Sequence, residues 1–337
     1  MKSTWSCWRL LPIHKHQTSN INLKVMVFIF LLCVTGIGVF WREDISLYFL
    51  PHDERPCACD QCLSEDGLLL SQNFSKFAEP LLSVNCNLSS ADFNWWSHIP
   101  GGKGSYSSYK TTVDRIFQML PASADVEPPS PDRCRTCAVV GNSVNLKDSH
   151  YGPLIDFQDI VMRMNRGRTK GYEADVGTRT THHVMYPESA VDLDNTTRLV
   201  LFPFKIRDLE WITKAFSTGF SRKLILKSNI RANKDLVMVL NPAFMRYVHH
   251  VWLRKKGSYP STGFMALVLA LHICDEVHVF GFGADSDGNW SHYWEELKNK
   301  KLKTGQHPGG EEYGVLQKLA QHQIVKFYMG RDSSLSI

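Results

Sequence analysis

The chain has 337 residues, of which 43% are apolar and 21% are charged, and its formal net charge is +5. This length and this apolar content are enough for a sizeable core, in one large domain or in two ordinary ones. The basic residues are scattered along the chain and form no stripe interleaved with aromatic side chains. Nucleic acid is therefore not expected as a partner.

An apolar segment near the N-terminus predicts a membrane anchor. Residues 25–41 contain no charged side chain, a length near the short end of what spans a bilayer. Four Lys or Arg residues precede the segment and Arg42, Glu43 and Asp44 follow it, so the positive-inside rule leaves the N-terminus in the cytosol. Small residues near Thr35 keep a cleaved signal peptide open as the alternative, although the apolar core is long for a signal and begins late. The predicted organisation is a cytoplasmic tail (1–24), a single-pass type II signal-anchor (25–41), a stem (42–56) and one lumenal domain (57–337).

Strand-like and helix-like segments alternate in the C-terminal two thirds of the chain. A proline-rich connection, residues 121–131, precedes them. Strands are predicted at residues 138–140, 160–164, 182–186, 199–202, 236–240 and 277–280, and helices at 244–253 and 262–273. This alternation predicts an α/β fold, Rossmann-like, with a mostly parallel sheet and helices on both faces.

Polar residues follow three of the predicted strands. Asn142 and Ser143 come after the first strand, Asn165 ends the second and Tyr186 ends the third. Ligands of open α/β sheets bind outside the carboxyl ends of the strands, so these four side chains are expected to face one crevice. The segment lacks both the G-x-G-x-x-G fingerprint and a P-loop, so a plain turn after the first strand is the alternative.

Four sequence blocks occur in an order that resembles the eukaryotic sialyltransferases. The resemblance extends from about Cys57 to the C-terminus and is strongest for the β-galactoside α-2,3-sialyltransferases that act on Galβ1,3GalNAc. It implies a lumenal catalytic domain with a GT-A-like variant of the Rossmann-like sheet. The blocks are Cys137 to Ser189, which resembles the large sialylmotif; Asn241 to Gly283, which resembles the small motif; His292-Tyr293-Trp294, which resembles the third; and His307 with Glu312, which matches His-x4-Glu.

The resemblance implies transfer of sialic acid from CMP-N-acetylneuraminic acid to the 3-hydroxyl of terminal galactose, with inversion. The loop from Tyr259 to Gly263 reads as a turn into a helix, where free backbone amides favour an anion, although an ordinary helix cap is the alternative. The residues expected to bind the donor are Asn142, Ser143, Asn165, Ser261, Thr262, Gly263, Gly283 and His292.

Two histidines are the predicted catalytic residues. His307 lies in a glycine-rich loop, where an imidazole can act as general base at the mildly acidic pH of a Golgi lumen. A lone loop histidine also fits a solvated bystander, and it is the motif match that assigns the catalytic role. By the same resemblance His292 is the cationic partner of the leaving phosphate, and Glu312 is structural or orienting.

The acceptor side departs from the pattern of the resembled family. Relatives that act on Galβ1,3GalNAc carry a glutamine where this chain has Pro100, and a tyrosine where it has Lys223, whereas Tyr186 and Tyr259 match. These four residues are the predicted acceptor-binding set. Loss of polar acceptor contacts can change which sugar is accepted without disturbing the donor site, so a different galactoside acceptor is the first alternative.

Seven cysteines follow the predicted anchor, and some have zinc-like spacing. In an oxidising lumen the same residues are more consistent with disulfides. The resemblance implies the pairs Cys57–Cys62, Cys59–Cys134 and Cys137–Cys274. Cys86 is then either free or part of an intermolecular bridge.

No metal and no cofactor are expected. Asp192-x-Asp194 and Asp285-x-Asp287 have the form by which many glycosyltransferases hold manganese on a nucleotide diphosphate, but CMP carries one phosphate and the resembled family works without metal. A metal-dependent glycosyltransferase and a non-catalytic glycan-binding lumenal protein are the remaining alternatives.

The expected partners are galactose-terminated glycoproteins and glycolipids and the Golgi membrane, and a homodimer is left open. A lumenal domain also makes its N-glycosylation sequons usable, and two or three are expected to be occupied. The sequons are at Asn73, Asn87, Asn195 and Asn289.

Overall fold

The computed structural model describes residues 25–33, 57–60, 62–63, 72–123, 126–128, 130–216, 230–296 and 304–330. The chain divides into two units, residues 1–54 and 55–337. In the first unit, residues 25–33 form a helix. Across the described residues, no helix combines the length and the apolar character needed to cross a membrane. Residues 34–41 of the predicted anchor lie outside the described ranges, so the anchor stays a prediction.

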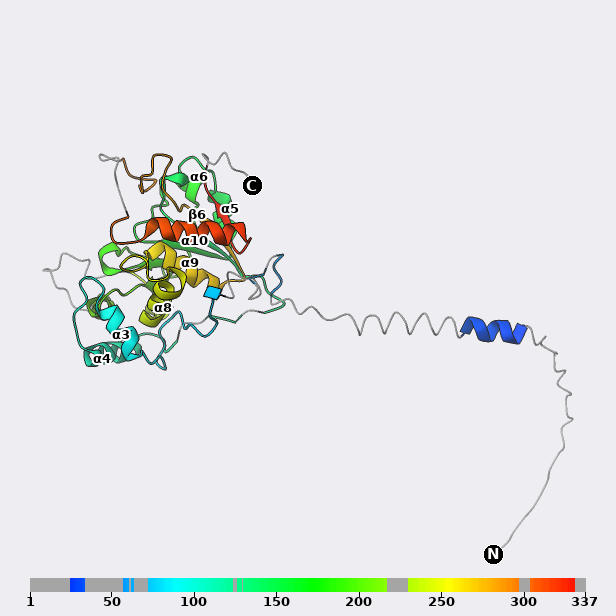
Figure 1. The fold of residues 1–337 in the computed structure, drawn as a ribbon, viewed down its shortest axis with the longest axis horizontal. Coiled ribbons are helices and arrows are strands. Elements are labelled where there is room, and N and C mark those ends of the chain that lie inside the picture. The colour runs from blue at the N-terminus through cyan, green and yellow to red at the C-terminus, as the bar shows by residue number, and fades with distance from the viewer. Residues whose placement is uncertain are drawn as a thin grey trace, which may run out of the picture. The chain divides into compact units, whose positions relative to one another are not determined.

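The second unit is built around a seven-stranded sheet in which every pairing is parallel (Figure 1). The strand order is β5-β4-β3-β2-β1-β6-β7. The chain proceeds outward from β1 to β5 and then returns to place β6 on the other side of β1, so the strand order reverses between β1 and β6. The strands are β1 Thr136–Val140, β2 Ile160–Met164, β3 His182–Met185, β4 Arg198–Leu201, β5 Val237–Val239, β6 Glu276–Phe280 and β7 Lys326–Tyr328.

Six of these strands lie within two residues of the predicted bounds, and the α/β prediction is confirmed. They were predictable because they are short apolar runs buried on both faces, as parallel strands are. The seventh strand, β7, was not predicted. It is a three-residue edge strand that is partly exposed, so it has no apolar run to reveal it.

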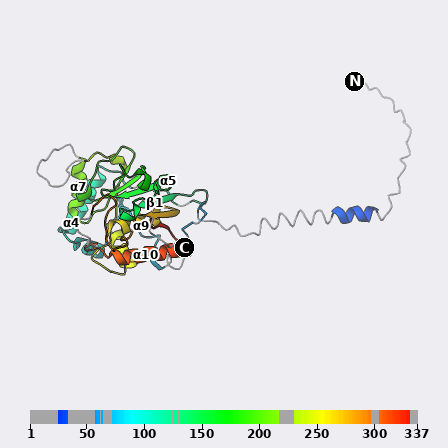
Figure 2. The same cartoon turned by 90° about the horizontal axis from the view of Figure 1, so that it is seen from above.

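Helices cover both faces of the sheet. Figure 2 shows β1 between α5 (Gly152–Phe157) on one side and α9 (Thr262–Ile273) with α10 (Gly309–Gln321) on the other. Successive β1 residues alternate between two cores, with Val139 on the α9 side and Ala138 and Val140 on the α5 side. The remaining helices are α3 Ser90–Ser97, α4 Tyr106–Phe117, α6 Glu173–Val176, α7 Ile206–Ala215 and α8 Pro242–Tyr247.

Helix α9 has the predicted bounds, whereas the helix predicted at 244–253 is not one regular helix. Ten of the twelve α9 residues are buried, as expected of a helix that is apolar all round and packs on the sheet. The other segment begins at Pro242, two residues early, and changes from α8 to a π-helical turn at Val248–Trp252. Apolar periodicity does not distinguish these two hydrogen-bond patterns.

Three disulfides join the pairs that the resemblance implied, Cys57–Cys62, Cys59–Cys134 and Cys137–Cys274. The third fastens β1 to the C-terminal end of α9. Cys86 is free and half-buried, and burial raises the pKa of its thiol. The role of Cys86 in an intermolecular bridge stays untested.

One predicted glycosylation site is buried in the fold. The Asn289 side chain is 3% exposed and its amide donates to both carboxylate oxygens of Asp285, so it is not accessible in the folded chain. Its glycosylation stays a prediction. In contrast Asn87 and Asn195 are exposed and Asn73 is half-buried.

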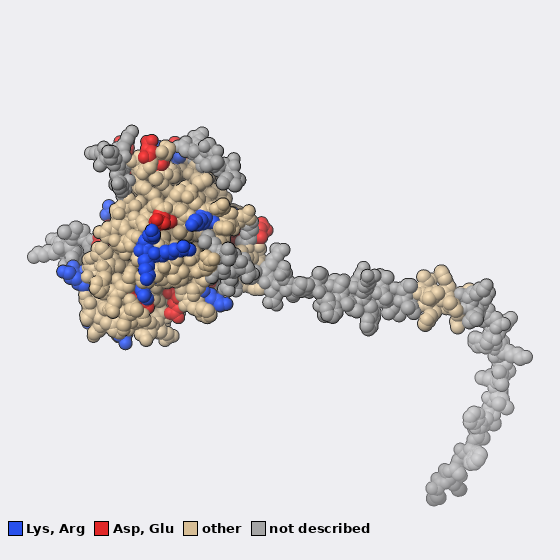
Figure 3. Space-filling view, viewed as in Figure 1, with Lys and Arg blue, Asp and Glu red and all other residues tan. Residues whose placement is uncertain are grey.

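On the face shown in Figure 3, basic and acidic side chains form small groups separated by uncharged surface, consistent with their scatter in the sequence.

Candidate active site

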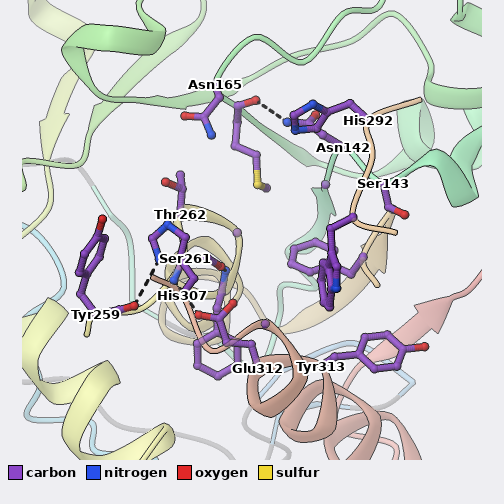
Figure 4. A pocket seen from close by; sticks show the side chains of 18 of the residues that line it. Asn142, Ser143, Asn165, Tyr259, Ser261, Thr262, His292, His307, Glu312 and Tyr313 are labelled. Atoms are coloured by element: carbon purple, nitrogen blue, oxygen red, sulfur yellow. Dashed lines mark hydrogen bonds between the residues drawn. The ribbon is translucent and has the colours of Figure 1, made fainter. Parts of the chain in front are cut away.

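A cavity of about 390 Å³ lies at the carboxyl ends of the central strands, where the strand order reverses. This is the position at which open α/β sheets bind ligands. Figure 4 shows that residues from the strand-end loops, the start of α9 and the start of α10 converge there. Lys223 lies outside the described residues. All other predicted catalytic, donor and acceptor residues line the cavity: Pro100, Asn142, Ser143, Asn165, Tyr186, Tyr259, Ser261, Thr262, Gly263, Gly283, His292 and His307.

The two strand-end asparagines are held by their neighbours. Asn142 Nδ2 donates to the carbonyl oxygen of Met164 at 3.2 Å. Asn165 adopts a left-handed backbone (φ 56°), which asparagine tolerates better than most residues. Its carbonyl oxygen lies 2.7 Å from His183 Nε2, and its side-chain oxygen accepts from Ser189 at 3.0 Å. These contacts leave the Asn165 amide nitrogen as the donor that faces the cavity.

His183, in β3, supports this geometry. Burial lowers the pKa of its imidazole, so the ring is neutral near pH 7. Since a carbonyl oxygen can only accept, Nε2 carries the proton that the Asn165 carbonyl receives.

Ser143 connects two loops instead of presenting a free hydroxyl. Its Oγ donates to the Gly283 carbonyl at 2.8 Å and its backbone amide donates to the Gly281 carbonyl at 3.0 Å. The two loops approach so closely that a Cβ on Gly141 would lie 2.2 Å from the Gly281 oxygen. Gly283 has φ 100° and a Cβ there would lie 2.7 Å from the Tyr313 ring. Space therefore requires a glycine at position 141, and at Gly283 both space and the left-handed backbone require one.

The N-terminus of α9 opens into the cavity through Ser261, Thr262 and Gly263. Ser261 is the N-cap, and its hydroxyl accepts from the backbone amide of Phe264 at 3.1 Å. Ser261 is thus a helix cap, and a capped helix N-terminus is still compatible with anion binding. The positive end of a twelve-residue helix favours an anionic ligand in this position.

Glu312, in the first turn of α10, joins the fourth block to the second. Its carboxylate accepts from the backbone amide of Ser261 at 2.7 Å, and the side chain is almost fully buried. Burial raises the pKa of Glu312 to about 7, against the opposing effect of the Ser261 hydrogen bond. Glu312 therefore positions the N-terminus of α9 relative to α10.

His307 has the orientation that a general base needs. Its Nδ1 lies 3.3 Å from the Tyr259 carbonyl oxygen, which can only accept, so Nδ1 carries the proton and Nε2 keeps a lone pair (Figure 4). The ring packs edge-on against the Tyr259 ring, with centroids 4.8 Å apart. Burial lowers the pKa of His307, and the hydrogen bond to Tyr259 only partly opposes this. The imidazole is consequently neutral near pH 7.

His292 is fixed at the rim of the cavity. Its ring stacks on Trp294 with centroids 4.6 Å apart, and its Nδ1 lies 2.8 Å from a carboxylate oxygen of Glu295. An antiparallel bridge between Ser143 and His292 ties the third block to the first. The cavity thus brings together the unprotonated Nε2 of His307, the imidazole of His292 and the N-terminus of α9.

Comparison with known proteins identifies the family. Residues 81–324 match the model of glycosyltransferase family 29 (sialyltransferase). The chain belongs to this family. The sialyltransferase prediction is therefore confirmed at the level of the family, and the chain is a glycosyltransferase.

Individual relatives of this family-29 chain cover nearly its whole length. It is 38% identical to the chicken CMP-N-acetylneuraminate-beta-galactosamide-alpha-2,3-sialyltransferase 1, over 92% of this chain and 98% of the relative. It is 40% identical to the mouse protein of the same name, over 94% and 100%. A mammalian sialyltransferase crystal structure in complex with Gal-beta-1-3GalNAc-ortho-nitrophenol superposes with a TM-score of 0.74 at 40% identity, over 82% of this chain and 100% of that chain.

Both D-x-D motifs of this family-29 chain cap turns. Asp194 accepts from the backbone amides of Thr196 and Thr197, and Asp285 accepts from those of Asp287 and Asn289. Within the ranges that the structure describes, no three His, Cys, Asp or Glu side chains are grouped so that they could hold a metal ion. Metal independence remains a prediction.

Two charged residues of the cavity, Glu188 and Lys205, were not among the predicted site residues. Glu188 lies at the end of the first block, whereas Lys205 lies outside all four blocks. Glu188 follows β3 by three residues and Lys205 follows β4 by four, so the strand-end rule that selected Asn165 and Tyr186 could have found both.

Proposed function

We propose that this chain transfers sialic acid from CMP-N-acetylneuraminic acid to the 3-hydroxyl of terminal galactose, with Galβ1,3GalNAc as acceptor. The observation that carries the proposal is the pairing, in one cavity, of the unprotonated Nε2 of His307 with the N-terminus of α9. The printed activity of the relatives and the acceptor analogue bound to the structural neighbour support the same reaction.

The donor is held by its charge and by its hydrogen-bonding groups. The amides of Asn142 and Asn165 offer donors and acceptors suited to cytidine and phosphate oxygens. The single phosphate lies against the α9 N-terminus, where the helix dipole and free backbone amides stabilise negative charge. His292 adds a second group that stabilises the phosphate as it leaves.

In the transfer step, His307 Nε2 takes the proton of the acceptor 3-hydroxyl. The hydroxyl oxygen forms a bond to the anomeric carbon of sialic acid while the bond from that carbon to the phosphate oxygen breaks. CMP leaves with the bonding electrons, and attack from the face opposite the phosphate inverts the anomeric configuration. Positioning, base catalysis and stabilisation of the leaving charge are all supplied by the protein.

The location follows from the sequence and from the cysteines. We infer that the chain is a single-pass type II protein of the Golgi membrane, because the residues before the apolar segment are basic. The three disulfides of the second unit support an oxidising compartment.

The test is a transfer assay with the full-length chain in detergent, in EDTA, with CMP-sialic acid and three acceptors: Galβ1,3GalNAc, Galβ1,3GlcNAc and Galβ1,4GlcNAc. We expect transfer to Galβ1,3GalNAc that EDTA does not abolish. Transfer to another of the three alone would move the proposal to that galactoside. No transfer to any of them, by a folded protein that still binds CMP, would refute it.

A further inference from the structure

Three charged side chains form a cluster on the wall of the cavity. Lys205 Nζ lies 2.7 Å from a carboxylate oxygen of Glu188 and 3.5 Å from one of Asp208. Glu188 and Lys205 line the cavity, with 41% and 23% of their side chains exposed, whereas the Asp208 side chain is 2% exposed. The first two can therefore contact a ligand, and Asp208 holds Lys205 from behind.

The cluster is positioned on the side of the cavity that holds His307. The Phe204 ring lies between Tyr186 and Tyr259, with centroids 5.7 and 5.5 Å away, and Tyr259 packs against His307. Burial raises the pKa of Tyr259, and the Lys205 ammonium opposes this rise, as it does at Tyr186. The ammonium is thus close to both tyrosines.

The backbone around the cluster keeps it in place. Asp208, in the first turn of α7, accepts from the backbone amide of Phe204 at 2.8 Å. A Cβ on Gly101 would lie 3.8 Å from the Lys205 side chain, so the turn that contains Pro100 covers the aliphatic part of the lysine. Lys205 is held between fixed neighbours and has little freedom to turn toward solvent.

The charge of the cluster decides which ligand it fits. Two carboxylates, those of Glu188 and Asp208, lie beside the single ammonium of Lys205, so the cluster has more acidic than basic groups. An anionic ligand, such as the phosphate or carboxylate of the donor, would be repelled by the two carboxylates. Neutral hydroxyl groups fit better, because the carboxylate accepts and the ammonium donates charge-assisted hydrogen bonds.

We propose that Glu188 and Lys205 are the pair that recognises the hydroxyl groups of the neutral acceptor sugar. Their hydrogen bonds to hydroxyls other than the reacting one orient the sugar so that the reacting hydroxyl faces His307. The assignment rests on the proposed function, since it takes the sugar on the His307 side to be the acceptor. It also explains how an acceptor is held where Pro100 offers no hydrogen-bonding side chain.

The experiment compares KM values for the two substrates in the full-length chain. Glu188→Gln keeps the shape of the side chain and leaves Lys205 paired with Asp208, and Lys205→Arg keeps the charge but changes its position. The matched control is Glu210→Gln, since Glu210 is 44% exposed and pairs with Lys214 on α7 away from the cavity lining. We expect each test variant to raise the acceptor KM roughly tenfold, with less than twofold change in the donor KM. The control is expected to change neither.

Two results would overturn the pair. One is an acceptor KM that changes less than twofold in both variants, and the other is a donor KM that rises as much as the acceptor KM. Calorimetric binding of the disaccharide to the CMP-loaded protein separates this inference from the proposed function. If the wild type binds the disaccharide without transferring sialic acid, the proposed function fails and the affinity of the Glu188→Gln variant decides the pair. If the wild type binds no galactoside, the pair is refuted as well.

Discussion

The two ends of the cavity are built in different ways. At the proposed donor end, contacts to backbone groups hold two loops together: Ser143 links to the Gly281 and Gly283 carbonyls, and Gly141 permits the close approach of the loops. At the proposed acceptor end, side chains form the wall, and of Tyr186, Glu188, Lys205 and Tyr259 only Lys205 lies outside the sequence blocks. A side chain added at Gly141 or Gly283 would displace neighbouring groups, whereas a change at Lys205 replaces only a side chain. We therefore expect the donor and the reaction to be more constrained than the acceptor.

The largest expected effect tests whether His307, between the proposed donor and acceptor ends, is the general base. His307→Ala is expected to lower kcat by about 10²- to 10⁴-fold, because the acceptor hydroxyl loses its proton acceptor. The donor KM should change little, since His307 contributes no predicted donor contact. His322, exposed at the end of α10, provides the control variant His322→Ala. A loss in kcat below tenfold would remove His307 from the role of base.

The Cys137–Cys274 disulfide joins β1 to α9 at the end of α9 away from the cavity, and its removal tests how much this link stabilises the fold. In the chain-entropy model, Cys137→Ala with Cys274→Ala opens a loop with a separation of 137 residues and is expected to cost about 4 to 5 kcal/mol of unfolding free energy. Cys57→Ala with Cys62→Ala opens a separation of only 5 residues and should cost about 2 kcal/mol. Denaturant unfolding measures both. Equal losses would show that loop length is not what makes the first bridge important.

Glu312 links the N-terminus of α9 to α10, and its effect on the free energy of unfolding depends on pH. Its pKa is raised from 4.5 to about 7, so the folded state keeps a proton that the unfolded state has already lost. Stability from this group is therefore full below pH 4.5 and is lost as the pH rises through about 7. Glu312→Gln should remove this dependence and gain at most about 3 kcal/mol on the wild type between pH 4.5 and 8. The test is to measure the unfolding free energies of the wild type and the variant at pH 4.5 and at pH 8. If the difference between the two proteins were the same at both pH values, the raised pKa would be contradicted.

The pH profile of kcat gives a smaller effect. An ordinary histidine would be about three-quarters protonated at pH 6. Because burial lowers the pKa of His307, the chain should keep more of its maximal kcat at that pH than the roughly one quarter that an ordinary histidine would leave. An acid limb centred at or above pH 6.5, in a protein that stays folded, would show that the imidazole is not shielded from water.

The smallest effect concerns Pro100 at the acceptor end. Pro100→Gln adds an amide to the cavity wall, and one new hydrogen bond should lower the acceptor KM by about two- to tenfold. The donor KM serves as the internal control. An altered donor KM with an unaltered acceptor KM would mean that the two ends are not separable in the way their construction indicates.

Properties that depend on local pattern or on motif order could be predicted from the sequence. Buried apolar runs predicted six parallel strands, and continuous apolar character predicted α9, because these features arise from residues near one another in the chain. The order of the four blocks indicated the family, the disulfide pairs and the histidine pair. Strand-end logic then placed Asn142, Asn165 and Tyr186 at one crevice, since parallel strands end at the same edge.

The contacts between distant segments became known only from the packed fold. The Glu188–Lys205 pair depends on the register of β3 beside β4, and the Glu312–Ser261 hydrogen bond joins residues 51 positions apart. The burial of Asn289 and the three-residue edge strand β7 likewise have no local signal. Periodicity reports which side of an element is buried, whereas the partner across a cavity is fixed only when the elements pack together.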